Sequence, residues 1–254
     1  MPDGVVDERD AVPFVRVGLT SKSLYFSIED VQSRMRLRDP DALDLRYTRT
    51  MMGFLMFRLA PARLLMIGLG GGSIAKFCHR HLPATRIDVV EINPRVIALR
   101  DTFGVPPDSA RFRVIEADGA AFLRSATMRY DVVLLDAFGE HGLPRRLATQ
   151  RFYDDSLDAL EPGGVLVSNF HSAAPDFPAC LERLDRSFGG GALVVEDEDH
   201  VNCIVFARKG GALAAPLDAR AARPKGVEAA AWAQLSRAFE RIATAVAGRG
   251  ARAP

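Results

Sequence analysis

The stretch from residue 64 to residue 91, LLMIGLGGGSIAKFCHRHLPATRIDVVE, constrains the fold more than any other part of the chain. It begins with a short apolar run at residues 64–67, which is typical of a buried parallel strand. A helical pattern at residues 74–81 ends near Pro83, and a second β-branched run at residues 87–90 ends at Glu91. Between the first strand and the helix lies a glycine turn with Gly68, Gly70, Gly71 and Gly72.

The acid at the end of the second strand indicates a nucleoside site. Ligands of open α/β sheets bind at the carboxyl ends of the strands, where the strand order reverses. A carboxylate such as Glu91 can accept hydrogen bonds there from both hydroxyls of a ribose. The turn nearly matches the dinucleotide fingerprint, but Ser73 stands where the third glycine belongs. The stretch therefore predicts a nucleoside or dinucleotide site.

Composition narrows the class of protein. A chain of 254 residues with 48% hydrophobic residues is long enough for one large domain with a small appendage. Its net charge of +1 predicts no nucleic-acid or membrane partner, and its start, MPDGVVDERD, does not resemble a signal peptide. The cysteines are odd in number and far apart, which favours a reducing compartment and no metal site. We therefore expect a cytoplasmic protein.

Strand and helix patterns alternate along the rest of the chain. Alternation of this kind predicts a mostly parallel sheet covered on both faces, here with one antiparallel strand at an edge. We expect an N-terminal β region and connecting helix (1–60), a Rossmann-like catalytic domain (61–209), and a linker with a C-terminal helix (210–254). Expected strands are 14–17, 24–28, 64–67, 87–90, 112–116, 130–135, 165–170, 192–196 and 202–207. Expected helices are 45–59, 74–81, 94–103, 120–125, 151–160, 178–188 and 227–246.

Three acids end successive strands: Glu91, Asp118 and Asp136. A dinucleotide enzyme needs only the first, so the pattern favours an S-adenosylmethionine-type ligand. Glu91 would hold the ribose hydroxyls, Asp118 beside Gly119 would accept from the adenine amino group, and Asp136 would face the sulfonium and the incoming nucleophile. An Asp before Gly also forms turns, and an Asp after a strand also caps loops, so these structural roles stay open.

The motifs GLGGGS, VEINPRVI and YDVVLLDAF, together with VQSRMRLRDPDALDLRYTRTMM, resemble the spermidine synthase (polyamine aminopropyltransferase) family. The resemblance covers residues 14–209. It implies a Rossmann-like, seven-stranded S-adenosylmethionine-dependent transferase fold, a small N-terminal β region and usually dimers or higher oligomers, and we expect a homodimer. It also implies a binding role for Gln32 and catalytic roles for Tyr47 and Asp136.

The sequence departs from the family pattern at acids that would bind positive charge. Gly71 stands where the family usually carries an Asp that binds the donor's amine, and Gly139 replaces the second Asp of the loop. Polyamine sites need several carboxylates, and this loop has gained Arg145 and Arg146 instead. Carboxylates that could compensate are Glu29, Asp44 and Glu140.

The glycine at position 71 bears on the donor. An Asp there would repel the carboxylate of ordinary S-adenosylmethionine, whereas bare N–H groups at a helix start can bind it. We therefore expect methyl transfer from S-adenosylmethionine, with aminopropyl transfer from its decarboxylated form as the alternative. A nucleoside-binding or regulatory protein without catalysis is the second alternative.

The expected acceptor is a small molecule with an amine. Asp136, helped by the Tyr47 hydroxyl, would orient the amine and take its proton, which is worth roughly 10²–10⁴-fold in rate. The loop at residues 137–150 would close over the acceptor, with Phe138, Glu140 and Arg145 as contacts.

Overall fold

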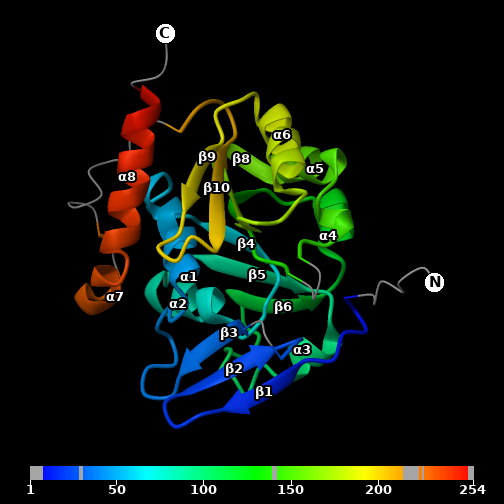
Figure 1. The fold of residues 1–254 in the computed structure, drawn as a ribbon, viewed down its shortest axis with the longest axis vertical. Coiled ribbons are helices and arrows are strands. Elements are labelled where there is room, and N and C mark those ends of the chain that lie inside the picture. Colours follow the sequence, from blue (N-terminus) through cyan, green and yellow to red (C-terminus); the bar gives the residue numbers. More distant parts are fainter. Residues whose placement is uncertain (1–7, 29–30, 139–141, 214–222, 225, 251–254) are drawn as a thin grey trace.

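The computed structural model describes residues 8–28, 31–138, 142–213, 223–224 and 226–250, which form two sheets and the helices that cover them (Figure 1). The strands are β1 Phe14–Val17, β2 Ser21–Tyr25, β3 Val31–Arg36, β4 Arg63–Ile67, β5 Arg86–Glu91, β6 Phe112–Glu116, β7 Tyr130–Leu135, β8 Leu160–His171, β9 Leu193–Glu196 and β10 Asn202–Arg208. The α-helices are α1 Arg46–Met51, α2 Ser73–His81, α3 Pro94–Ala98, α4 Gly119–Ser125, α5 Gln150–Ala159, α6 Phe177–Phe188, α7 Ala229–Ala233 and α8 Ser236–Gly250. Two 3₁₀ helices are η1 Met52–Met56 and η2 Arg145–Leu147.

The large sheet has seven strands in the order β6-β5-β4-β7-β8-β10-β9, and the small antiparallel sheet has the order β1-β2-β3. Strand β4 pairs in parallel with β5 on one side and with β7 on the other. The strand order therefore reverses between β4 and β7, which is where open α/β sheets bind ligands. The expected Rossmann-like seven-stranded fold with a small N-terminal β region is confirmed.

The antiparallel strand lies inside the sheet, so its expected place at the edge was wrong. Strand β10 runs antiparallel to both β8 and β9, and β9 forms the edge. Ile204 and Phe206 of β10 are fully buried. A strand this apolar is stabilised by pairing on both sides, whereas the short β9 leaves few backbone groups unpaired at the edge.

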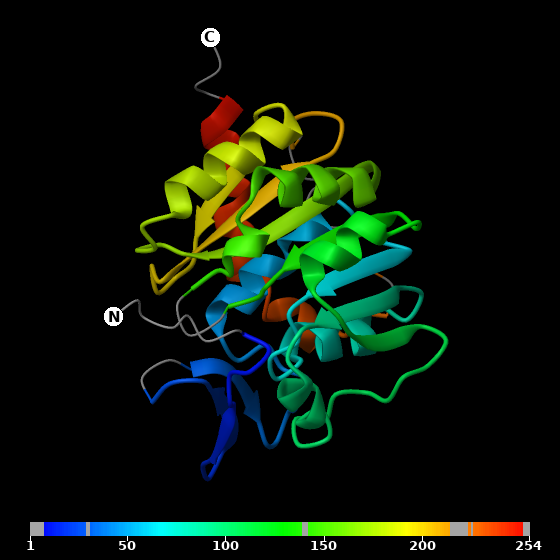
Figure 2. The same cartoon turned by 90° about the vertical axis from the view of Figure 1, so that its right-hand side faces the viewer.

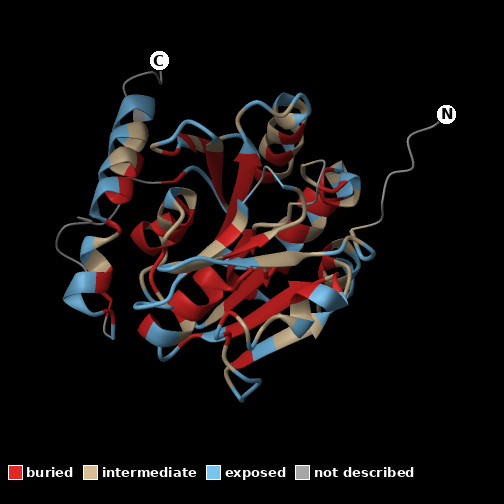
Figure 3. Cartoon of the chain, turned by 60° about the horizontal axis from the view of Figure 1, so that its bottom comes forward, coloured by how far each residue is buried: buried red, intermediate tan, exposed pale blue. Residues whose placement is uncertain are grey.

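Alternate residues of the central strands point into two cores on opposite faces of the sheet. One core is shared with α1, η1, α2 and α8, and the other with α4, α5 and α6. Figure 2 shows α4, α5 and α6 in front of the sheet and α8 behind it. In Figure 3 the sheet and the inner faces of the helices are buried, while the outer helix faces are exposed. This three-layer arrangement follows from the nearly continuous apolar strands.

Three helices differ from expectation. The one expected at residues 45–59 becomes α1 followed by η1, and the one at 227–246 divides into α7 and α8. Helix α3 ends at Ala98, and hydrogen-bonded turns continue to Gly104. At Gly53, a Cβ atom would lie 2.3 Å from Cδ1 of Ile242 and 2.9 Å from Cζ of Phe206. The glycine therefore lets η1 pack closely against α8 and β10.

The C-terminal helix packs on this same chain. Leu235, Phe239 and Ile242 are buried in the core shared with α1 and η1, and α8 lies beside β9 in Figure 1. The division of the chain into three parts stays a prediction. In the described part of the chain, no helix is both long and apolar enough to cross a membrane.

Candidate functional site

A pocket lies at the carboxyl ends of β4, β5 and β7, next to residues of the small sheet. It brings together predicted site residues that are up to 106 positions apart in sequence. Those that line it are Gln32, Tyr47, Gly68, Gly70, Glu91, Asp118, Gly119, Asp136 and Phe138. Gly71, Gly72 and Arg145 do not line it, and Glu140 lies outside the described residues.

Glu91 at the end of β5 is held in a fixed orientation. Its Oε2 accepts from the Leu69 backbone N–H at 2.9 Å, and its Oε1 accepts from the Asn93 N–H at 2.9 Å. Burial raises the pKa of this carboxyl, and those backbone hydrogen bonds oppose the rise. Each carboxylate oxygen keeps a further lone pair for a ribose hydroxyl.

The glycine turn lets β4 and β7 approach one another. Gly68 has φ +96, and a Cβ atom there would lie 2.2 Å from the carbonyl oxygen of Asp136. A side chain at position 68 would therefore push Asp136 out of place. Gly68 therefore allows β4 and the end of β7 to lie close together, a structural role that the nucleoside-binding pattern did not predict.

Gly71 packs against Ser33 of β3 and is not among the residues that line the pocket, and its predicted role in binding the donor stays a prediction. A Cβ atom at position 71 would lie 2.6 Å from Oγ of Ser33 and 3.1 Å from Cδ1 of Phe103. Ser33 and Ser73 line the pocket here, with their Oγ atoms 3.4 Å apart. Two neutral hydroxyls therefore occupy the region where the resemblance led us to look for an acid. Gly72, the N-cap of α2, likewise packs against Val105.

Both carboxylate oxygens of Asp118 accept hydrogen bonds. Its Oδ1 caps α4 by accepting from the Ala121 N–H at 2.8 Å, and its Oδ2 accepts from Arg146 Nη1 at 3.0 Å. Arg146 also forms an ion pair with Glu8. The capping role left open by the sequence is therefore present, and an adenine amino group would share Asp118 with Arg146.

Asp136, at the end of β7, forms the polar centre of the pocket. Its Oδ2 accepts from the Tyr47 hydroxyl at 3.2 Å, and its Oδ1 accepts from Asn169 Nδ2 at 3.0 Å. Burial raises the pKa of Asp136 to about 6, although both hydrogen bonds oppose the rise. Burial, and then the Asp136 charge, raises the pKa of Tyr47 well above its usual range. At neutral pH this pair is therefore an ionised carboxylate beside a neutral phenol.

Two asparagines behind Asp136 were missed from the sequence. Asn169 of β8 is 1% exposed, and its Oδ1 accepts from Asn202 Nδ2 at 2.9 Å. Strands β7 and β8 pair with Leu135 opposite Ser168, so Asp136 and Asn169 are the next residues along. The available signal was the pair of polar residues Ser168 and Asn169 near the end of an otherwise apolar run.

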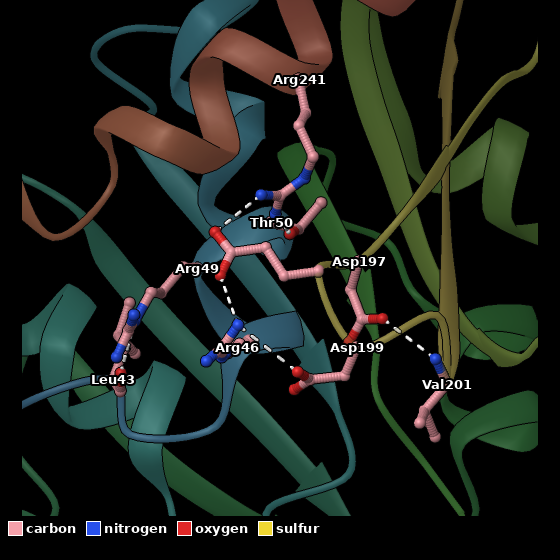
Figure 4. A network of polar contacts seen from close by, with 9 residues as sticks. Leu43, Arg46, Arg49, Thr50, Asp197, Asp199, Val201 and Arg241 are labelled. Carbon is pink, nitrogen blue, oxygen red and sulfur yellow. Dashed lines mark hydrogen bonds and ion pairs between the residues drawn. The ribbon is translucent and has the colours of Figure 1, made fainter.

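A second polar network supports the elements that carry Tyr47 and Asn202 (Figure 4). Glu198, between β9 and β10, accepts from Arg46 Nη1 at 2.7 Å and from Arg241 Nη1 at 2.8 Å. Arg241 of α8 also donates to Thr50 Oγ1 at 3.2 Å. The C-terminal helix therefore ties the helix of Tyr47 to the turn that precedes Asn202.

Two expected acceptor-site residues lie elsewhere. Arg145 is exposed, whereas the next residue, Arg146, lines the pocket, because the η2 turn directs the two side chains apart. Asp44 lies between Arg34 and Arg36, which hold the pKa of its carboxyl below its usual value against the effect of burial. Asp44 is therefore neutralised by arginines and does not line the pocket. Glu29 falls outside the described residues.

The described residues contain no group of three or more His, Cys, Asp or Glu that could hold a metal ion. The pocket brings together the buried acid Glu91, the acid Asp118 and the hydrogen-bonded Asp136–Tyr47 pair, and the roles expected for them toward ribose, adenine and the nucleophile stay predictions. Acids and a buried carboxylate–phenol pair at the point where the strand order of a Rossmann-like sheet reverses favour a nucleoside-dependent group-transfer enzyme.

Comparison with known proteins gives the family. A spermine/spermidine synthase domain matches residues 44–174. A polyamine aminopropyltransferase of Neisseria meningitidis is 38% identical over 200 residues, which cover 76% of each chain. This chain belongs to the spermine/spermidine synthase family, so it is an enzyme of the S-adenosylmethionine-type alkyl transferase class, as the resemblance implied.

Solved structures agree with the fold. A probable spermidine synthase from Corynebacterium glutamicum superposes with a TM-score of 0.68 at 21% identity, covering 77% of this chain and 76% of that one. Human methyltransferase-like protein 13, solved with SAH, gives a TM-score of 0.60 at 25% identity, covering 79% of this chain and 93% of that one. Solved structures that bear spermidine synthase and methyltransferase-like names therefore share this architecture.

Proposed function

We propose that this chain transfers an aminopropyl group from decarboxylated S-adenosylmethionine to a small amine. This reverses the preference for methyl transfer, because the alternative of aminopropyl transfer agrees better with the family. The observation that carries the proposal is the Asp136–Tyr47 pair at 3.2 Å, set in the same pocket as the ribose acid Glu91. The Neisseria relative bears the name polyamine aminopropyltransferase, which supports the same reaction.

In the proposed reaction, the amine nitrogen attacks the aminopropyl carbon bonded to the sulfonium. The new C–N bond forms as the C–S bond breaks, and the electron pair of that bond stays on sulfur to give methylthioadenosine. The proton leaves the amine for Asp136, whose pKa of about 6 makes it a base at neutral pH. Holding both reactants in line can lower the barrier by roughly 7–11 kcal/mol.

A second candidate reaction, methyl transfer from ordinary S-adenosylmethionine, is favoured by the environment of Gly71. Ser33 fills the space above this glycine, so the region lacks the carboxylate that would repel the donor's own carboxylate. The two reactions leave different products, because aminopropyl transfer releases methylthioadenosine and methyl transfer releases S-adenosylhomocysteine.

The test is mass spectrometry of products after incubation of the purified protein with each donor and a panel of linear di- and triamines. Methylthioadenosine with an aminopropylated amine supports the main proposal. S-adenosylhomocysteine with a methylated amine supports the second candidate. Tight binding of methylthioadenosine without turnover of either donor would contradict both candidate reactions with these amines.

We also propose that the chain forms a homodimer in the cytoplasm. Large apolar side chains are exposed at and beside β1: Val12 at 68%, Val17 at 67% and Leu19 at 100%. Burial of these side chains against a second copy would remove apolar surface from water. Light scattering of the wild-type protein and of a Leu19→Glu variant tests the homodimer, since the variant should shift toward monomer.

A further inference from the structure

The side-chain amide of Asn169 lies between Asp136 and Asn202. Its NH₂ group donates to Asp136, and its oxygen accepts from Asn202. An ionised carboxylate only accepts hydrogen bonds, so Asp136 requires the NH₂ end of this amide. The Oδ1 end then needs a donor on its other side, and Asn202 Nδ2 supplies one at 2.9 Å. Because Asn169 is 1% exposed, water has little access to it as a substitute donor.

Asn202 is itself held by the turn between β9 and β10. Asp197, which is 3% exposed, accepts from the Val201 N–H at 3.1 Å and from the Asn202 N–H at 3.3 Å. The Asp197 N–H in turn donates to the Asn202 carbonyl at 2.9 Å. Figure 4 shows the Asp197–Val201 contact. The acidic turn therefore fixes the backbone from which the Asn202 side chain reaches Asn169.

We propose that Asn169 and Asn202 form an amide relay that holds Asp136 as a hydrogen-bond acceptor, and that Asn202 sets the direction of that relay. The proposal rests on the proposed function, in which Asp136 is the base. Asn169 and Asn202 are positioning residues, because they act on the reaction only through Asp136. An Asn169 turned end for end would oppose its oxygen to that of Asp136 and favour the protonated acid.

Other titratable or charged groups share the pocket with Asp136. Tyr47 of α1 faces it directly, and Glu8, Glu91, Asp118 and Arg146 line the same pocket. Asn202 does not line the pocket and forms no hydrogen bond with these groups. A substitution at Asn202 therefore changes the hydrogen bond to Asn169 and leaves these groups in place.

The decisive variant is Asn202→Asp, which converts the donor into an acceptor without changing its size. Asn169 should then donate to the new carboxylate at position 202 and present its own oxygen to Asp136. We expect the titration midpoint of Asp136 to rise by about one pH unit or more, because the Asn169 oxygen would then face the Asp136 carboxylate and disfavour its ionised form. The midpoint is read by ¹³C NMR of labelled Asp carboxyls, with the Asp136 signal assigned by its loss in Asp136→Asn.

The added charge is controlled in two ways. Val201→Asp places the same charge on the neighbouring residue, which is 46% exposed, and should leave the midpoint close to wild type. In an Asn169→Ala background the relay is broken, so Asn202→Asp should produce little further change. An equal rise in the Asn169→Ala background, or no rise in the Asn169 protein, would overturn the proposal.

A second variant covers the case in which Asn202→Asp does not fold. Asn202→Ala leaves Asn169 free to rotate, and the midpoint should rise in the same direction but by less. Binding of methylthioadenosine by calorimetry checks that each variant retains the pocket. An unchanged midpoint in a folded Asn202→Ala protein would also overturn the relay.

The NMR titration needs no substrate turnover, so it separates this inference from the proposed function. A shifted midpoint in a protein without transfer activity would refute the function and keep the relay. If the protein is active but substitutions at Asn202 change neither the midpoint nor the pH profile of kcat/KM, the proposed function stands and the relay is refuted.

Discussion

Replacing Asp136 by Asn should stabilise the protein at alkaline pH while it removes the proposed base. The carboxyl has an ordinary pKa of 3.8 and a folded-state pKa of about 6, so its ionised form is less favourable in the folded protein than in the unfolded chain. A shift of this size corresponds to roughly 3 kcal/mol. Because the folded pKa is raised, the contribution of this group to the stability of the wild-type protein is highest below pH 4 and is lost as the pH rises through about 6.

An Asn at this position carries no charge at any pH and keeps both contacts. Its oxygen can accept from Asn169, and its NH₂ can donate to the Tyr47 oxygen. The free energy of unfolding of Asp136→Asn should therefore exceed that of wild type by up to about 3 kcal/mol at pH 8 and approach it at pH 4. Transfer activity should fall by roughly 10²–10⁴-fold.

Urea unfolding of both proteins at pH 4, 6 and 8 measures the difference. Glu116→Gln, a neutralisation at an exposed site, is the matched control and should change little at any of these pH values. The reasoning fails if Asp136→Asn is no more stable than wild type at pH 8, or if its advantage is the same at pH 4.

Three further predictions concern the site and the fold. Tyr47→Phe removes a hydrogen bond that lowers the pKa of Asp136, so the acid limb of kcat/KM should move to higher pH, and an unmoved limb would contradict the assignment. Glu91→Gln should weaken methylthioadenosine binding by roughly 10–100-fold in calorimetry, because a charged acceptor for the ribose hydroxyls is lost, and unchanged affinity would place the ribose elsewhere. Gly53→Val should lower the free energy of unfolding by about 1–3 kcal/mol, since its side chain would overlap Ile242 and Phe206, and a neutral result would show that α8 can shift.

The residues that could be predicted from sequence are those that end strands. Glu91 and Asp136 each follow a β-branched or aliphatic run, and the carboxyl ends of parallel strands meet at one edge of a sheet. Tyr47 could be placed only by the resemblance, because nothing in a short helix indicates that its side chain reaches β7.

The residues that were missed depend on register and on distant pairings. Asn169 lies beside Asp136 because Leu135 pairs with Ser168, and this register cannot be read from either strand alone. Ser33 reaches Gly71 from the small sheet, 38 positions earlier in the chain. The pair β9 and β10 could join the sheet with either strand beside β8, and the structure places β10 there. The sequence of the two strands does not decide between these two orders.

The central claim is tested most directly by the products that the purified protein forms from decarboxylated and ordinary S-adenosylmethionine with the amine panel. We expect methylthioadenosine and an aminopropylated amine from the decarboxylated donor, with both lost in Asp136→Asn. S-adenosylhomocysteine and a methylated amine from the ordinary donor, without aminopropyl transfer, would contradict the account.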